Sequence, residues 1–303
     1  MPAPNDPGIR HKKGIDMKIA RFLSEGKVLL GVVDTANNVV HPLDHGLTGT
    51  ADLIRLSISG FDHRPATEAG LPLSDVQLLA PIIPDRNIFC VGKNYFEHAK
   101  EFAGSGFEAG AVKGQEIDSY PAIFSKPPST VVGPDAVVEM HPQATQAVDY
   151  EAELAVIVGR PGRNISEADA MKHVWGYTII NDVTARDRQK NHKQWLAGKG
   201  LDTFCPMGPW IVTADEIDGE NLDIECKVNG ELRQKANTGS LIFKIPQLLA
   251  AISAGLTLNP GDVIATGTPA GVGIGFTPPR FLKSGDRVEI SVSGIGSLSN
   301  TFA

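Results

Sequence analysis

Short alternating runs of apolar and polar residues dominate this chain, and most are bounded by Gly, Asn or Asp. Alternation with a period of two is typical of strands, because successive side chains of a strand face opposite sides of the sheet. The pattern predicts strands at residues 17–22, 27–33, 88–91, 136–140, 222–228, 262–265 and 287–292. Helical spacing is rarer and predicts helices at residues 51–59, 95–102, 167–174 and 247–254. The third helix has Ser166 as its N-cap, with Asp169 in the position of a capping-box acid. The pattern therefore indicates an α+β fold that is mostly β.

Two runs depart from this alternation because they are apolar on both faces, at residues 155–159 and 175–180. Such runs predict strands buried between two layers. Glu151 and Glu153 precede the first run, and Asp182 follows the second. Because residues i and i+2 of a strand face the same side, the two glutamates would project together. Such carboxylates need a proton, a basic side chain or a cation between them, and a hard divalent metal suits them well. A half-solvated strand remains the alternative for this segment taken alone.

The chain has 303 residues and 42% hydrophobic content, which is enough for one large domain or for a small domain and a larger one. Residues 1–16 are polar and rich in Pro and charge, and we expect them to be a disordered leader. The Pro-containing stretch at 70–84 indicates a boundary between a small N-terminal domain at 17–80 and a catalytic domain at 85–303.

The formal net charge of -7, with scattered basic residues, argues against nucleic acid and anionic membranes as partners. Small anionic substrates remain possible if a metal and a few cations bind them. No window approaches the roughly 20 apolar residues of a transmembrane helix. The cysteines are Cys90, Cys205 and Cys226, an odd number without paired spacing, which favours a reducing cytoplasm.

Two further segments carry possible chemistry. His98 and Glu101 would share one face of the second helix, where the carboxylate can orient the imidazole for proton abstraction. The alternative is an ordinary solvated pair on a helix surface. The glycines at 267–275 resemble a dinucleotide loop only superficially, because the expected helix does not follow, and we reject nucleotide binding. Trp195, Cys205 and Trp210 are expected to serve packing.

Six motifs follow one another in this order: GKNYFEHAKE (92–101), FSKP (124–127), DYEAEL (149–154), NDVTARD (181–187), KGLDTFCP (199–206) and GTPAGVG (267–273). In this order they resemble the fumarylacetoacetate hydrolase superfamily, from about residue 85 to the end. The opening strands from residue 17 are similar to the small N-terminal domain of many bacterial members. The resemblance implies a mixed β-sandwich roll and a homodimer. The chain has Asn94 where the animal enzyme has a further Asp, which favours the acylpyruvase or fumarylpyruvate hydrolase-like branch.

The resemblance also implies roles for individual residues. It places Glu151, Glu153 and Asp182 on a Mg²⁺, Mn²⁺ or Ca²⁺ ion and makes His98 and Glu101 a water-activating pair. Lys199 matches an active-site lysine. The positions that match substrate contacts are Lys126, Arg186, Gln189 and Thr268. From the residues alone, Arg186 could equally pair with Asp187, and Lys199 could be an exposed loop lysine.

The resemblance finally implies a metal-dependent hydrolase that cleaves the C–C bond of a 1,3-diketo acid, of the acylpyruvate or fumarylpyruvate type. The products would be pyruvate and a carboxylic acid, and the substrate a small anionic keto acid. One alternative is an oxaloacetate-type decarboxylase or a hydroxymuconate-type isomerase or decarboxylase of aromatic catabolism. Another is a non-catalytic metabolite-binding member. These stay open because all share the ion and differ in the group that supplies or receives a proton.

Overall fold

The computed structural model describes residues 17–43, 46–58, 70–106 and 119–303. The leader expected at 1–16 lies outside the described residues. The strands are β1 (Lys18–Ser24), β2 (Lys27–Asp34), β3 (Val39–Pro42), β4 (Leu71–Pro72), β5 (Gln77–Leu78), β6 (Ile88–Gly92), β7 (Ala122–Lys126), β8 (Val131–Val132), β9 (Val137–Val138), β10 (Val148–Asp149), β11 (Ala152–Val158), β12 (Val174–Asn181), β13 (Thr184–Ala185), β14 (Cys205–Thr213), β15 (Asp223–Val228), β16 (Glu231–Asn237), β17 (Val263–Ala265), β18 (Arg287–Val292) and β19 (Gly296–Phe302). The helices are α1 (Thr50–Ile58), α2 (Phe96–Gly104), α3 (Glu167–Ala170), α4 (Arg186–His192), α5 (Leu196–Lys199) and α6 (Ile245–Ser253).

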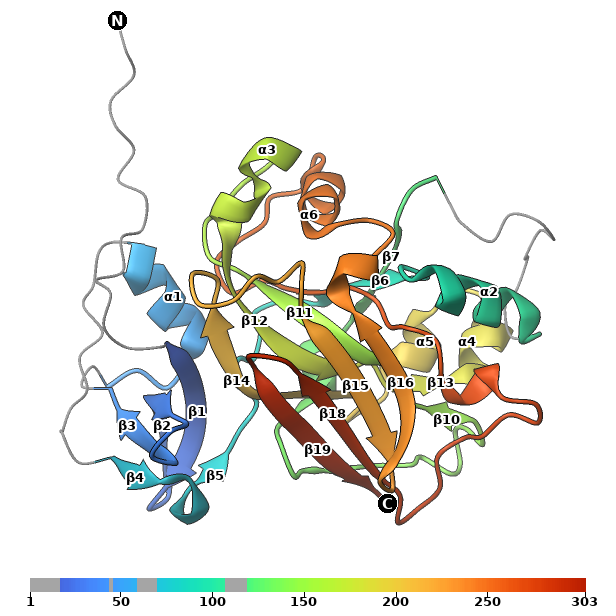
Figure 1. Ribbon diagram of the computed structural model, residues 1–303, viewed down its shortest axis with the longest axis horizontal. Helices are drawn as coiled ribbons and strands as arrows, with labels where there is room; N and C mark the ends of the chain where they lie inside the picture. Colours follow the sequence, from blue (N-terminus) through green and yellow to red (C-terminus); the bar gives the residue numbers. More distant parts are fainter. Residues whose placement is uncertain (1–16, 44–45, 59–69, 107–118) are drawn as a thin grey trace, which may run out of the picture.

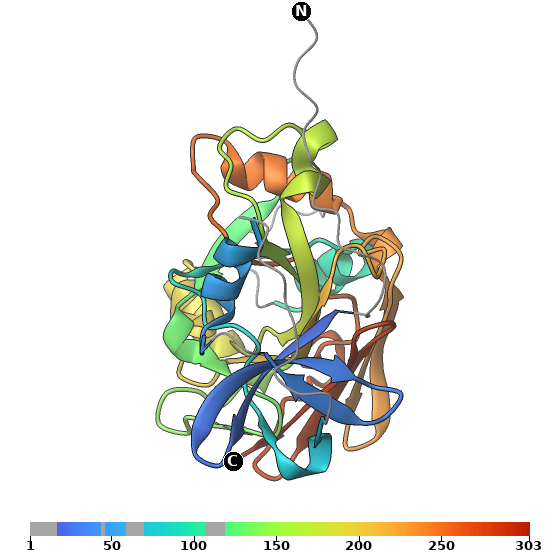
Figure 2. The same ribbon diagram turned by 90° about the vertical axis from the view of Figure 1, so that its left-hand side faces the viewer.

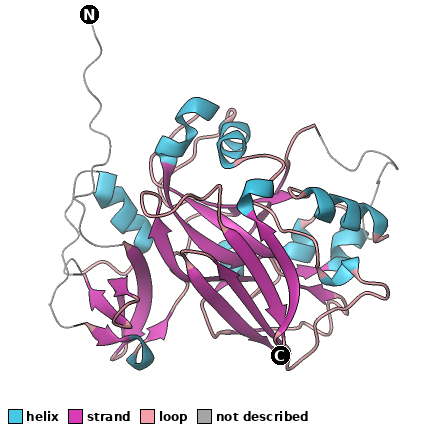
Figure 3. Ribbon diagram, in the orientation of Figure 1, coloured by secondary structure: helices cyan, strands magenta, loops and turns pink. Residues whose placement is uncertain are grey.

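A long sheet forms the centre of the protein, with strand order β4-β3-β2-β1-β14-β12-β11-β17-β6-β7. β11 and β12 pair antiparallel in its middle, whereas β17 and β6 are parallel. A second sheet, with order β16-β15-β18-β19-β9, covers one face of it (Figure 1). The helices lie around the edges of these strands (Figure 3). The fold is therefore the mostly β sandwich that the sequence predicted.

Both faces of β11 are buried because alternate residues belong to different cores. Leu154 and Val156 pack in the core that includes Ile224 and Ile290 of the second sheet. Ala155 and Ile157 belong to the core on the opposite face of the central sheet. This two-sided burial is the physical reason for the apolar run at 155–159.

The N-terminal strands extend the central sheet rather than form a separate one. β1 pairs antiparallel with β14, with Lys18 opposite Val212. Ile19 and Leu30 share a core with Ile211, and α1 packs on the same core. Figure 2 shows this unit from its own side, with its blue strands in front. The N-terminal unit expected at 17–80 is thus continuous with the larger part in both sheet and core.

Most predicted elements recur with shifts of one to three residues at their ends, and β18 matches the predicted strand 287–292. The helix predicted for 167–174 is too long. α3 ends at Ala170, a 3₁₀ turn follows, and Val174 begins β12 because it pairs with β11. No apolar periodicity marks α4, which is polar in sequence, and the prediction missed it. Within the described residues, no helix combines the length and the apolar character needed to cross a membrane.

Candidate active site

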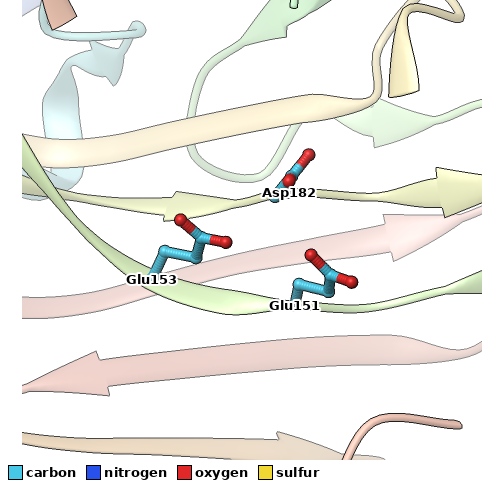
Figure 4. A group of neighbouring side chains, drawn as sticks. All are labelled: Glu151, Glu153 and Asp182. Atoms are coloured by element: carbon cyan, nitrogen blue, oxygen red, sulfur yellow. The ribbon is translucent and has the colours of Figure 1, made fainter. Parts of the chain in front are cut away.

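Three buried carboxylates meet where β11 begins and β12 ends. Ala152 pairs with Asn181, and the backbone N–H of Asp182 donates to the carbonyl of Glu151 at 2.8 Å. This register brings one carboxylate oxygen of each of Glu151, Glu153 and Asp182 within 4.8 Å of one another. Figure 4 shows the two glutamates on one stretch of chain and Asp182 on the neighbouring one. Each of the three residues is at most 4% exposed, so solvent does not screen their charges.

Three buried cations surround the carboxylates. Lys199 Nζ donates to Glu151 Oε2 and to Asp182 Oδ2, both at 2.6 Å. Arg186 Nη2 lies 2.6 Å from Glu151 Oε1. Lys126 Nζ lies 2.7 Å from Asp182 Oδ1, in an ion pair without hydrogen-bond geometry. Lys199 is thus a buried side chain between two acids and not an exposed loop lysine.

The carboxylates differ in their affinity for protons. Although burial alone would raise it, the neighbouring Lys199 and Arg186 lower the pKa of Glu151 to about 2. Among the described residues no cation forms an ion pair with Glu153, and burial beside Asp182 and Glu151 raises its pKa well above the ordinary value although Lys199 lowers it. Burial alone would lower the pKa of Lys199, but Asp182 and Glu151 hold it above its usual range. Glu153 is therefore the member of the triad that needs a further positive charge to ionise.

The donor set suits a hard divalent cation. The buried charged side chains of the cluster are four acids and three cations: Asp149, Glu151, Glu153, Asp182, Lys126, Arg186 and Lys199. One negative charge is in excess when all are ionised. Asp182 Oδ1 is buried and accepts no hydrogen bond from any described residue, and its ion pair with Lys126 shows that this oxygen already faces a positive charge. Carboxylate oxygens are the ligands that Mg²⁺, Mn²⁺ and Ca²⁺ prefer, and the residues therefore fit such an ion.

The predicted dyad lies beside this cluster on α2. His98 Nδ1 is 3.1 Å from Glu101 Oε2, and His98 is 4% exposed. Glu101 Oε1 also accepts the backbone N–H of Gly271 at 3.0 Å. With Glu101 ionised, His98 Nδ1 would carry the shared proton, and Nε2 of the neutral ring would be the proton acceptor. The pair is not the solvated surface pair of the alternative.

The glycine-rich segment that follows β17 holds three of these acids through its backbone. Gly267 N donates to Glu153 Oε2 at 2.8 Å, and Gly271 N donates to Glu101. The backbone N–H of Gly273 donates to Asp149 Oδ1, and the backbone N–H of Ile274 donates to Asp149 Oδ2. Gly267 has φ +108°, and a Cβ there would come within 2.7 Å of Asn94 Cβ, so glycine is required. The segment acts as a frame for acidic side chains.

A pocket of about 280 Å³ opens over the cluster. It is lined by Val91, Gly92, Lys93, His98, Phe102, Phe124, Glu151, Glu153, Arg186, Gln189, Trp195, Lys199 and Thr268. The predicted substrate contacts Arg186, Gln189 and Thr268 therefore share one cavity with His98. Lys126 is fully buried and is not among the lining residues.

Two buried polar residues were not singled out by the sequence. Asp149 accepts Arg186 Nε at 2.9 Å, so Arg186 pairs with Asp149 and Glu151 rather than with Asp187. Gln234 Nε2 donates to Thr268 Oγ1 at 2.8 Å. Its Oε1 accepts the backbone N–H of Ala152, the residue before Glu153. Asp149 stands inside the quoted motif DYEAEL, but Gln234 has no local signal because its partners are distant in the chain.

The side chain of Asn94 is occupied by the backbone. Its Nδ2 donates to the carbonyls of Thr266 and Phe243, and its Oδ1 accepts the N–H of Phe243. Asn94 therefore ties α2 to the glycine-rich segment.

Two family models match this chain. The family model for the C-terminal domain of fumarylacetoacetate (FAA) hydrolase matches residues 87–303, and a model described as Rv2993c-like, N-terminal, matches residues 17–81. Oxaloacetate tautomerase YisK of Bacillus subtilis is 52% identical over 230 residues, which are 75% of this chain and 73% of that protein.

Solved structures give the same picture. Fumarylacetoacetate hydrolase from Exiguobacterium antarcticum superimposes with a TM-score of 0.82 at 42% identity, over 94% of this chain and 99% of that chain. Maleylpyruvate hydrolase from Sphingobium sp. SYK-6, in complex with manganese(II) and pyruvate, has a TM-score of 0.71 at 32% identity, over 95% of this chain and 99% of that chain.

Proposed function

Because the chain belongs to the fumarylacetoacetate hydrolase family, we propose that it is a divalent-cation-dependent tautomerase of a small dianionic 2-oxo acid of the oxaloacetate type. The observation that carries this proposal is one pocket lined by Glu151, Glu153 and His98 together. The 52% identity to an oxaloacetate tautomerase supports it. This relative favours the oxaloacetate-type alternative of the sequence analysis over the C–C bond hydrolysis that was its main expectation.

Glu151, Glu153 and Asp182 would hold Mg²⁺ or Mn²⁺. When bound, such an ion supplies Lewis-acid polarisation of the 2-oxo group and electrostatic stabilisation of developing negative charge. With all four acids ionised, the bound ion would leave the cluster with one positive charge in excess. A dianionic substrate is then attracted to a site that is otherwise lined by acids.

Keto and enol forms differ by one proton, which moves between C3 and the oxygen on C2. In the keto-to-enol direction His98 Nε2 takes the proton from C3, Glu101 stabilises the imidazolium that forms, and the imidazolium then gives this proton to the oxygen on C2. The hydroxyl of Thr268 accepts from Gln234 Nε2, so its own proton is left to donate to a substrate oxygen in the pocket. Arg186 offers a buried guanidinium to a substrate carboxylate, and Asp149 fixes its orientation.

Hydrolysis of an acylpyruvate is the second candidate function. The same His98–Glu101 pair has the geometry to deprotonate a water, and the similar structure of maleylpyruvate hydrolase supports this candidate. Hydrolysis requires a water in the pocket, whereas tautomerisation requires only a proton carrier.

The test is to follow the ultraviolet absorbance of enol oxaloacetate with the enzyme and Mn²⁺, together with mass spectrometry of the products. We expect faster exchange of enol and keto forms without a change in mass, loss of that rate with a chelator, and its recovery with Mn²⁺. His98→Ala should retain Mn²⁺ and lose most of the rate. Mn²⁺ without enzyme controls for metal-catalysed decarboxylation. Release of carbon dioxide as the main event, or addition of water to an acylpyruvate without any effect on enol exchange, would contradict the proposal.

A further inference from the structure

Three aromatic side chains form the apolar side of the pocket. Phe102 comes from α2, Phe124 from β7, and Trp195 immediately precedes α5. The Trp195 ring meets Phe124 edge-on at 5.0 Å between centroids and Phe102 edge-on at 6.0 Å. We call these three residues the aromatic wall. Edge-to-face contacts at these distances are favourable, so the wall is a packed surface.

Trp195 lies directly on the backbone of Gly92. A Cβ at position 92 would come within 2.3 Å of Trp195 Cζ3, which is closer than any real contact. The indole is therefore wedged between the end of β6 and the two phenylalanines. The indole cannot move aside for a larger ligand without displacing these neighbours.

The backbone of Trp195 is also tied to the charged end of the pocket. Its carbonyl accepts the N–H of Lys199 at 3.0 Å and that of Gly198 at 2.9 Å. A Cβ at Gly198 would lie 2.6 Å from the backbone nitrogen of Gln189, so α5 packs closely on α4. The single turn of α5 thus fixes the indole relative to Lys199, which contacts the carboxylates.

The aromatic wall borders the cations of the pocket. Lys199 Nζ lies 5.0 Å from the centre of the Phe124 ring, and Arg186 Cζ lies 6.0 Å from the centre of the Phe102 ring. A substrate whose 2-oxo acid end binds at the carboxylates and their cation would therefore have the aromatic wall beside its remaining part.

We propose that Trp195 sets the length of substrate that this pocket accepts, and that it restricts the enzyme to 2-oxo acids whose group beyond C3 is a single carboxylate or another group of one or two carbons. This inference rests on the proposed function, because it takes the orientation of the substrate from it. A longer acyl group would have to displace the indole from Gly92 and from both phenylalanines.

The test measures binding instead of turnover. The probes are oxalate, oxamate and N-alkyl oxamates from methyl to butyl, titrated by calorimetry into the Mn²⁺-loaded protein. The wild type should bind oxalate and oxamate and lose affinity about tenfold or more by the butyl compound. Trp195→Ala should bind oxalate within about twofold of the wild type and the butyl compound at least tenfold better, and Trp195→Phe should lie between them.

Leu196→Ala is the matched control, because Leu196 is the next residue, is 48% exposed and does not line the pocket. It should keep the chain-length preference of the wild type. Equal affinity of the wild type for short and long oxamates would overturn the inference. The inference would also be overturned if Trp195→Phe had the same chain-length preference as the wild type. This outcome counts even if Trp195→Ala does not fold. If oxalate does not bind to the Mn²⁺-loaded wild type, the proposed function itself fails.

Discussion

Asp149 Oδ2 accepts a hydrogen bond from Arg186 Nε at 2.9 Å, and both side chains are at most 1% exposed. The other carboxylate oxygen of Asp149 accepts the N–H of Gly273. This one side chain therefore connects the pocket arginine with the glycine-rich segment, which in turn holds Glu101.

We expect Asp149→Asn to destabilise the protein by about 3–5 kcal/mol, because it leaves the buried charge of Arg186 with Glu151 as its only acidic partner. Chemical denaturation measures the change. Asp169→Asn is the control, since Asp169 is exposed and its ion pair with Lys172 is on the surface; its effect should stay below about 1 kcal/mol. Equal effects of the two substitutions would contradict a structural role for the buried pair.

Glu153→Gln should abolish Mn²⁺ binding while leaving the metal-free protein within about 1 kcal/mol of the wild type. Burial raises the pKa of Glu153 and so favours the protonated carboxyl in the metal-free protein, and an amide of the same shape replaces that form. Asp182→Asn should also lose the metal, but it should destabilise the protein by about 3–5 kcal/mol, because Lys126 and Lys199 lose an acidic partner. Calorimetric Mn²⁺ titration and denaturation separate the two effects. A large loss of stability in Glu153→Gln would show that this carboxyl is ionised without metal.

Uptake of Mn²⁺ should release a proton from Glu153. The folded pKa of Glu153 is raised above its ordinary value of 4.5, so its stabilising contribution is present below that pH and is lost as pH rises through the raised pKa. The free energy of unfolding of the metal-free wild type should therefore fall with rising pH relative to Glu153→Gln. Mn²⁺ affinity should rise over the same range.

Titration in two buffers with different ionisation enthalpies measures the released proton. If close to no protons are released per bound Mn²⁺ throughout the acidic range, the assignment to Glu153 is wrong.

Gly275→Ala should reduce turnover and leave Mn²⁺ binding intact. A Cβ at position 275 would lie 1.6 Å from Glu101 Oε1, so the carboxylate has to move away from His98. Misplacement of about 1 Å in such a pair can reduce the rate about a hundredfold. Gly104→Ala on the same helix as Glu101 is the control, because a Cβ there meets nothing within 4 Å. The prediction is checked by measuring kcat and Mn²⁺ affinity for both variants. A normal kcat for Gly275→Ala would show that Glu101 has no role in the proposed mechanism.

Local pattern was sufficient for the predicted strands and for the carboxylate triad, but it did not identify β14, β16 or β19. The period of two places Glu151 and Glu153 on one side of a strand whatever the rest of the chain does, and the runs at 155–159 and 175–180 require burial on both faces. The order of six motifs identified the family. These features depend on residues that are close in sequence, so the sequence by itself determined them.

Tertiary structure decided which partners the acids have. Lys199 could have been an exposed lysine and Arg186 could have paired with Asp187; packing of α5 and α4 against β7 and β13 instead places both cations on Glu151. Gln234 reaches the site from the second sheet, and the amides of the glycine-rich segment reach it from the end of the neighbouring strand β17. Both are more than 80 residues away in the chain from the groups they bind. The Trp195 ring lines the pocket only because Gly92 has no side chain. Burial makes charged contacts strong, and burial is a property of the assembled layers, so no local pattern could have revealed which contacts form.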